Sequence, residues 1–217
     1  MIKISASILD VNILEIKENL IKVENLIDRV HFDIADGCFV PNLTFGPKFI
    51  RDLKNVVNKQ FEAHLMVFDP SKFFRELEKL VYIVYFHVNA TKSVIDDIKF
   101  AKSLGLKVGI ALSPEIQVED VVKYLPEVDG VLVMLVKPGY GGQKMDELQL
   151  KKIQLLDEYR RRNKLSYEIA ADGGIKPYNA SRVAAAGADV LVSGSGIFGE
   201  DPVQALLNFK KELKMYE

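Results

Sequence analysis

The sequence predicts a single (β/α)₈ TIM barrel, and three observations support this fold class. Short apolar runs rich in β-branched residues alternate with longer segments of helical periodicity along the whole chain. Eight such pairs fit in 217 residues, close to the lower end of the size range of this architecture. No linker-like stretch interrupts the alternation, so we expect residues 1–217 to form one domain.

Each predicted strand is a short apolar segment, and each predicted helix is amphipathic with apolar residues spaced by three and four. The strands are expected at 2–8, 29–33, 61–65, 82–87, 107–112, 130–135, 167–171 and 189–192. The helices are expected at 13–26, 47–56, 70–80, 93–104, 118–125, 148–162, 177–186 and 202–213. Prolines suited to a first helical turn and glycines just past helix ends mark several boundaries, namely Pro47, Pro70, Pro177, Pro202, Gly105 and Gly187.

An open doubly wound sheet is the alternative architecture. It usually has fewer strands, and a Gly-rich fingerprint should follow its first strand, where this chain has ILDVN. We therefore favour the closed barrel.

The composition favours a small-molecule partner over nucleic acid or a membrane. The 29 basic and 30 acidic residues leave a formal net charge of −1, so no basic field attracts a polyanion. The longest apolar runs, such as GVLVMLV, are far shorter than the roughly 20 residues of a membrane helix, and the N-terminus lacks the features of a leader peptide. The single cysteine, Cys38, agrees with a reducing compartment, so we expect a cytoplasmic location.

Polar side chains at strand ends predict a metal site. The stretch VHFDIADGCFVPN places His31 and Asp33 on one strand face, which is the interior face in a barrel. His64 and Asp172 are expected at or just past the C-terminal ends of the third and seventh strands, the rim where barrel enzymes keep their sites. These nitrogen and oxygen donors suit one divalent ion, whether zinc, iron, manganese or cobalt. His87, at the end of the fourth strand, is a candidate for a supporting or substrate-side role.

Glycine-rich segments after the last three strands predict a phosphate site. They are KPGYGGQ (137–143), DGG (172–174) and VSGSGIFG (192–199). Glycine lets the backbone approach an anion and turn its N–H groups towards it, and a short helix expected at Ser195 would add its N-terminal dipole. Phosphate sites recur at the last two loops of this fold.

A metal flanked by two carboxylates, with a phosphate held at a distance, suits proton abstraction beside a carbonyl. If Asp33 and Asp172 lie on opposite faces of the planar enediolate, one removes a proton and the other returns one to the far side. The product is then an epimer. No glycine pattern matches a nicotinamide fingerprint, so no organic cofactor is expected.

The chain resembles the ribulose-phosphate 3-epimerase family over nearly its whole length. The matching segments are SASIL, HFDIADGCFVPNLTFGP, HLMV, VLVMLVKPGYGGQK, ADGGI and GADVLVSGSGIFG, in this order. The resemblance implies a metal-binding isomerase of carbohydrate metabolism that interconverts D-ribulose 5-phosphate and D-xylulose 5-phosphate in the pentose phosphate pathway. A ketose phosphate is then the small-molecule partner, and we expect a homo-oligomer.

The resemblance also implies roles for individual residues. His31, Asp33, His64 and Asp172 match the metal ligands, and Asp33 and Asp172 match the acid/base pair. The implied substrate-binding residues are Ser7, His64, Met66, Met134, Gly139, Gly141, Gly142, Gly173, Gly174, Gly194 and Ser195.

Departures from the family lie near the substrate and leave a second substrate open. The family commonly has methionine at the position of Ala35 and asparagine at that of Lys137. A smaller residue at position 35 would make room for a longer sugar, such as the ketohexose phosphate D-allulose 6-phosphate.

Two other functions compete with epimerisation. Decarboxylases and aldolase-like synthases on related phosphate-binding barrels typically carry D-x-K-x-x-D, whereas DIAD here has alanine at the lysine position. A non-catalytic sugar-phosphate-binding barrel would have no need of carboxylates that flank the reacting carbon.

Overall fold

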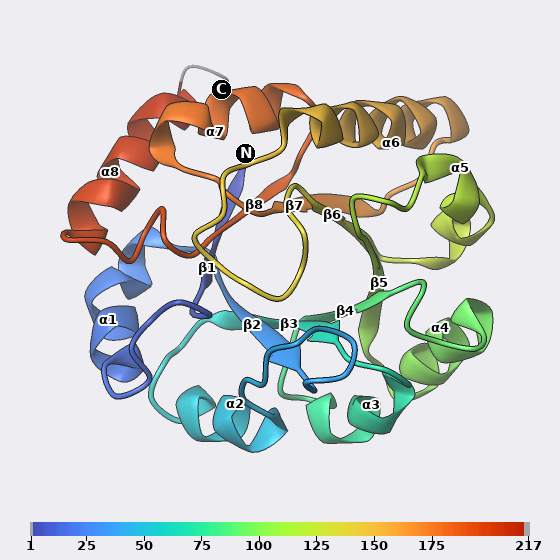
Figure 1. The fold of residues 1–217 in the computed structure, drawn as a ribbon, viewed down its shortest axis with the longest axis horizontal. Coiled ribbons are helices and arrows are strands. Elements are labelled where there is room, and N and C mark those ends of the chain that lie inside the picture. Colours follow the sequence, from blue (N-terminus) through green and yellow to red (C-terminus); the bar gives the residue numbers. More distant parts are fainter. Residues whose placement is uncertain (1, 215–217) are drawn as a thin grey trace.

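The computed structural model describes residues 2–214 as a closed barrel of eight parallel strands ringed by helices (Figure 1). The strands are β1 (Lys3–Ser7), β2 (Arg29–Ala35), β3 (Gln60–Met66), β4 (Ile83–His87), β5 (Lys107–Leu112), β6 (Gly130–Met134), β7 (Glu168–Asp172) and β8 (Val190–Ser193). Each strand pairs with the next along the chain, and β8 pairs back with β1. The predicted barrel is confirmed, and the open sheet, which would leave two free edges, is excluded.

Each predicted helical segment contains a helix, with shifted boundaries. The helices are α1 (Ile16–Val23), α2 (Pro47–Lys54), α3 (Ser71–Leu77), α4 (Val94–Ser103), α5 (Val118–Val121), α6 (Leu150–Asn163), α7 (Pro177–Ala185) and α8 (Pro202–Leu213), with 3₁₀ turns η1 (Glu24–Leu26), η2 (Val122–Glu127) and η3 (Glu147–Gln149). The first helix begins three residues later than predicted, and Ile13 and Leu14 before it are exposed. The fifth continues as a 3₁₀ turn containing Pro126, which has no N–H for an α-helical bond. Across residues 2–214, no helix combines the length and the apolar character of a membrane span.

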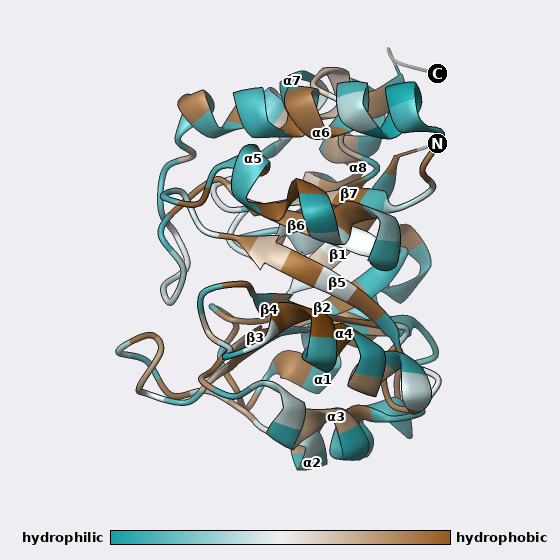
Figure 2. Cartoon of the chain, turned by 90° about the vertical axis from the view of Figure 1, so that its right-hand side faces the viewer, coloured by the Kyte–Doolittle hydropathy of each residue, from teal (hydrophilic) through white to brown (hydrophobic). Residues whose placement is uncertain are grey.

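The apolar core lies between the strands and the helices. Outward-facing strand residues such as Phe32, Phe61 and Phe86 are fully buried in this layer. Figure 2 shows the same division, with brown apolar strands at the centre and teal polar stretches on the outer helices. Because strand neighbours alternate, the residues between these apolar ones point into the barrel.

The barrel interior is apolar on one side and polar on the other. Strands β4 to β8 contribute an apolar cluster of Ile83, Tyr85, Ala111, Leu132, Met134, Ala170, Val190 and Val192. Strands β1 to β3 contribute buried polar side chains, namely Ser5, Ser7, Arg29, His31, Asp33, Glu62 and His64. Buried charges require partners, and this polar side is where the chain concentrates them.

An ion-pair network at the N-terminal end of the barrel strands balances these charges. The Arg29 guanidinium donates to Glu62 at 3.1 Å and to both carboxylate oxygens of Glu168, at 2.5 and 2.9 Å. The Tyr85 hydroxyl donates to Glu168 at 2.9 Å. Arg29 and Glu62 are almost completely buried, so each compensates the desolvation of the other.

Gly109 on β5 makes room for the buried ring of Tyr85, because a Cβ at Gly109 would overlap that ring and crowd the carbonyl oxygen of Gly130. We predict that Gly109→Ala lowers the free energy of unfolding by about 1–3 kcal/mol, the usual cost of overpacking. Urea denaturation measures it. The matched control is Gly199→Ala, whose new methyl group would meet open space and should change stability by less than about 0.5 kcal/mol. Equal stabilities for the two variants would contradict this account of Tyr85.

Candidate active site and metal centre

Four side chains from three strands converge inside the barrel. One ligand atom each of His31, Asp33, His64 and Asp172 lies within 4.8 Å of all the others. His64 Nδ1 is 2.9 Å and His31 Nε2 3.4 Å from Asp33 Oδ1, and both imidazole nitrogens are 3.9 Å from Asp172 Oδ2. The structure thus brings together all four predicted ligands.

The position of His64 differs from the prediction. Strand β3 continues beyond His64 to Met66, because β3 keeps its pairing with β2 up to Ala35 opposite Met66. His64 therefore points into the barrel, directly beside its register partner Asp33, instead of lying at the rim. Asp172 is the last residue of β7, as expected.

The surroundings of His31 fit a cation. Its Nδ1 lies 2.8 Å from Glu62 Oε1, a carboxylate oxygen that only accepts, so Nδ1 carries a proton. Its Nε2 is buried without a hydrogen-bond partner, facing Asp33 and Asp172. An unpaired buried nitrogen is costly, and a divalent ion held by two imidazoles and two carboxylates would satisfy it. The residues therefore fit one divalent metal.

Charges in the cluster are strongly coupled. Burial disfavours a charge on His31, but the Asp33 and Glu62 carboxylates raise the pKa of His31 well above its ordinary value. Burial also opposes ionisation of Asp33, yet the positive charge of His31 holds the Asp33 pKa well below its usual range. Burial and the negative charge of Asp33 raise the pKa of Asp172 to about 7. The two carboxyl groups are pushed in opposite directions, the pattern of an acid and a base.

A pocket opens above the cluster. Predicted substrate-binding residues that line it are Ser7, Met66, Met134, Gly139, Gly141, Gly142, Gly173, Gly174, Gly194 and Ser195. Asp33 and Asp172 also line it, whereas His31 and His64 lie beneath its wall. The structure therefore gathers the whole predicted substrate set except His64 around one cavity.

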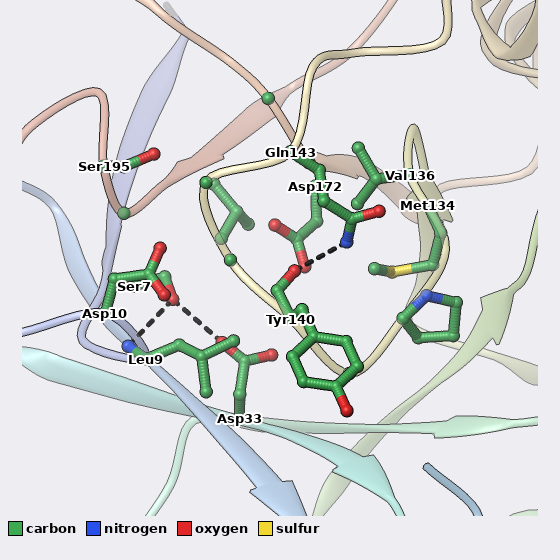
Figure 3. Close-up of a pocket in the computed structure, with 18 of the residues that line it drawn as sticks. Ser7, Leu9, Asp10, Asp33, Met134, Val136, Tyr140, Gln143, Asp172 and Ser195 are labelled. Carbon is green, nitrogen blue, oxygen red and sulfur yellow. Dashed lines mark hydrogen bonds between the residues drawn. The ribbon is translucent and has the colours of Figure 1, made fainter. Parts of the chain in front are cut away.

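The two carboxylates approach the pocket from opposite sides. Figure 3 shows Asp33 reaching in from β2 and Asp172 from β7, with Met134 beside them. The Ser7 hydroxyl donates to Asp33 Oδ2 at 2.8 Å, which fixes the orientation of that carboxylate. A planar group between the two residues would present one face to each.

The glycine loops lie on the other side of the pocket, with a lysine among them. Lys176 Nζ donates to Ser195 Oγ at 2.9 Å. Gly174 has φ +65°, and a Cβ there would overlap the Met145 backbone, so only glycine fits. The short helix expected at Ser195 is absent: residues 194–198 form a single turn, closed by the N–H groups of Ile197 and Phe198 on the Gly194 carbonyl. The loop is too glycine-rich to continue as a helix.

A covering loop follows β6. Asn42 Nδ2 donates to the Gly139 carbonyl at 2.9 Å, and the Tyr140 hydroxyl to the Pro41 carbonyl at 3.3 Å. These contacts join the loop after β2 to the loop after β6, which crosses the barrel mouth in Figure 1. Sequence periodicity gives no signal for contacts between loops.

Three polar residues of the site were missed in the sequence. Asp10 lines the pocket and packs so closely on the loop after β6 that a Cβ at Gly141 would overlap its carboxyl group. Lys176 and Glu62 were missed as well. Only Glu62 left a signal, because Glu62 and His64 repeat the i, i+2 spacing of His31 and Asp33.

Two alternatives from the sequence, a longer sugar as substrate and a decarboxylase or synthase function, lose their structural basis. Ala35 is 4 % exposed, packs with Val40, Met66 and Phe39, and is not among the residues lining the described pocket, so it opens no room for a longer sugar. Asp36 is the second aspartate of the DIAD segment, which was compared with the D-x-K-x-x-D motif of the decarboxylases and synthases. It accepts hydrogen bonds from the backbone N–H groups of Cys38, Phe39 and Phe68, which makes it a loop-forming residue.

Solved structures of two other proteins share the fold. KGPDC from Streptococcus mutans superposes with a TM-score of 0.75 at 15% identity over 99% of this chain and 98% of its own. The 3-hexulose-6-phosphate synthase of Salmonella typhimurium superposes with a TM-score of 0.74 at 19% identity over the full length of both chains. Identities this low establish the barrel alone.

Sequence relatives are more specific. The model of the ribulose-phosphate 3 epimerase family matches residues 3–198. Ribulose-phosphate 3-epimerase of Methanocaldococcus jannaschii is 38% identical over 98% of this chain and 91% of its own length. The Bacillus subtilis enzyme of that name is 33% identical (92% and 94% covered), and the chloroplastic Arabidopsis thaliana enzyme 36% (95% and 75%). The chain therefore belongs to the ribulose-phosphate 3-epimerase family.

Proposed function

We propose that this protein interconverts D-ribulose 5-phosphate and D-xylulose 5-phosphate by inverting the configuration at C3. The observation that carries the proposal is the placement of Asp33 and Asp172 on opposite sides of one pocket, above two histidines and beside glycine loops. The names of the relatives supply the substrate pair.

The two carboxyl groups divide the proton transfer between them. One carboxylate takes the C3 proton, which leaves the planar enediolate of the sugar, and the other, as carboxylic acid, returns a proton to the opposite face of C3. The reverse reaction exchanges the roles. Ser7, through its bond to Asp33, keeps that carboxylate aimed at the pocket.

His31, Asp33, His64 and Asp172 would hold one divalent ion, which we propose to be zinc, iron, manganese or cobalt. When bound, this ion supplies positive charge that stabilises the negative oxygen of the enediolate. Glu62 sets the orientation of His31 from behind by accepting its Nδ1 proton.

Lys176, Ser195 and the glycines after β6, β7 and β8 would hold the phosphate. Lys176 brings a positive charge to the loops, and Ser195 is within hydrogen-bond distance of it. Backbone N–H groups of glycine-rich turns are suited to phosphate oxygens. Met66 and Met134 add apolar side chains to the lining of the pocket.

The pentulose phosphate is favoured over D-allulose 6-phosphate. The three relatives compared above carry the name of the pentulose enzyme. Ala35, the basis of the hexulose alternative, is enclosed by its own neighbours. We further propose a cytoplasmic location and a homo-oligomeric assembly, and light scattering after size exclusion tests the assembly.

The test of the function compares kcat/KM for D-ribulose 5-phosphate and D-allulose 6-phosphate in deuterated water, using chelated protein reloaded with metal. We expect preference for the pentulose and deuterium incorporation at C3, both lost in chelated protein. Preference for the hexulose would show that the substrate is a hexulose phosphate, with the same mechanism. No exchange with either sugar would favour a binding protein.

Asp172→Asn should lower kcat by about 10²–10⁴-fold, the usual contribution of a positioned acid or base. The amide keeps the shape of the side chain but neither gives up nor accepts a proton. Steady-state kinetics measure the loss, and circular dichroism checks that the fold is retained. The control is Asp52→Asn on the exposed face of α2, which should act as wild type. Near-normal turnover of Asp172→Asn would remove Asp172 from the proton transfer.

Lys176→Met should raise KM by about tenfold or more with a much smaller effect on kcat, since a hydrogen bond to a charged group contributes about 1.5–3 kcal/mol. The reacting carbon lies away from this lysine, at Asp33 and Asp172. The control is Lys151→Met on the exposed face of α6. A fall in kcat with KM unchanged would contradict the assignment of Lys176 to the phosphate.

A further inference from the structure

On the side away from the pocket, His64 begins a chain of three buried groups. Its Nε2 lies 2.8 Å from Nε2 of His87 at the end of β4, and His87 Nδ1 lies 3.0 Å from Oγ of Ser113, which follows β5. All three residues are at most 1 % exposed, and neither His87 nor Ser113 lines the described pocket. His87 and Ser113 therefore reach the cluster by hydrogen bonds through His64.

The contacts of His64 give this hydrogen-bond chain one direction as long as no cation is bound to Nδ1. His64 Nδ1 faces Asp33 Oδ1, which only accepts, so Nδ1 carries the proton. The 2.8 Å contact between the two Nε2 atoms needs one donor and one acceptor, and a neutral imidazole has one N–H and one lone-pair nitrogen. His64 Nε2 then accepts from His87 Nε2, and His87 Nδ1 accepts from the Ser113 hydroxyl.

A cation at His64 Nδ1 requires the opposite arrangement. A metal binds the nitrogen lone pair, so the His64 proton has to be on Nε2. Nε2–H then donates to His87 Nε2, and His87 Nδ1–H donates to Ser113 Oγ. Each imidazole has exchanged one N–H for the other, and the hydroxyl has kept its proton. Three protons are present on the three groups in both arrangements, so both imidazoles stay neutral.

The two histidine ligands are thus supported in different ways. His31 has Glu62 behind it, and a carboxylate can only accept, so the Nδ1 proton of His31 stays in place with or without a cation. His64 has a second imidazole and a hydroxyl behind it, and both of these groups can donate or accept. Only the support of His64 can change direction without a change of charge.

We propose that His87 and Ser113 are positioning residues that release the Nδ1 lone pair of His64 to a divalent cation, through a hydrogen-bond chain that reverses when the cation binds. The inference rests on the cation site of the proposed function. It adds that a pair of residues outside the pocket contributes to metal affinity.

The tautomers of the imidazoles provide the direct test. The protein has only three histidines, so their signals can be assigned individually. Long-range ¹H–¹⁵N spectra of chelated protein should show the proton of His64 on Nδ1 and that of His87 on Nε2. After addition of one equivalent of Zn²⁺, the His64 proton should be on Nε2 and the His87 proton on Nδ1. His31 should carry a proton on Nδ1 in both spectra.

Variants at Ser113 provide the second test. Ser113→Ala removes the group that ends the chain, and its affinity for Zn²⁺, from competition with a chelator, should be about 10–100-fold weaker. Ser113→Thr keeps the hydroxyl and should restore most of the affinity. The control is Ser103→Ala, which removes an exposed hydroxyl at the end of α4 and should bind Zn²⁺ as wild type. Thermal melts of the metal-free proteins show that the variants fold.

The outcomes separate this inference from the function on which it rests. Stoichiometric Zn²⁺ binding with the His87 proton still on Nε2 would overturn the reversal and leave the epimerase site intact. Equal Zn²⁺ affinity of Ser113→Ala and wild type would overturn the role of Ser113. Absence of stoichiometric Zn²⁺ binding by the wild type would overturn the cation site, and the inference with it.

Discussion

The pairing register of β2 with β3 is the constraint on which the site depends. It sets Asp33 opposite His64 and His31 opposite Glu62, so four polar side chains enter the barrel together. A slip of β3 by one residue against β2 would turn Glu62 and His64 into the outer layer, where Phe61 now packs. Because both faces of these strands are buried, the outer apolar residues specify the same register that the inner polar residues require.

Glu62 connects the site to the ion pairs beneath it. Its Oε1 accepts from Ser5 and lies against His31 Nδ1, while its Oε2 accepts from Arg29. Arg29 in turn binds Glu168. Removing one member of such a network leaves a buried charge without a partner, which is more costly than never having had the pair. The ion pairs at the N-terminal end of the strands therefore help to hold the His31 imidazole in place.

Sequence reasoning recovered what depends on periodicity and missed what depends on contacts between segments. Alternation within a strand placed His31 and Asp33 inside the barrel, and the closed topology brought Asp172 to them. The same rule applied to Glu62 would have found the support of His31. Asp10 and Lys176 lie on loops, whose paths follow from tertiary packing and not from spacing. The end of β3 was placed one residue too early, because its pairing with β2 continues to Met66, opposite Ala35.

The acid/base end and the phosphate end of the pocket are covalently joined. Asp172 is followed directly by Gly173 and Gly174, and two residues span at most about 7 Å of extended chain. Gly174 is held against the Met145 backbone in a conformation that only glycine adopts readily, so this segment has little freedom to lengthen. If Asp172 and the glycine loop act as proposed, this short segment sets the distance from the reacting carbon to the phosphate. A sugar with an additional carbon between these two points would then have to bend, because the segment that joins the two ends has little freedom to lengthen.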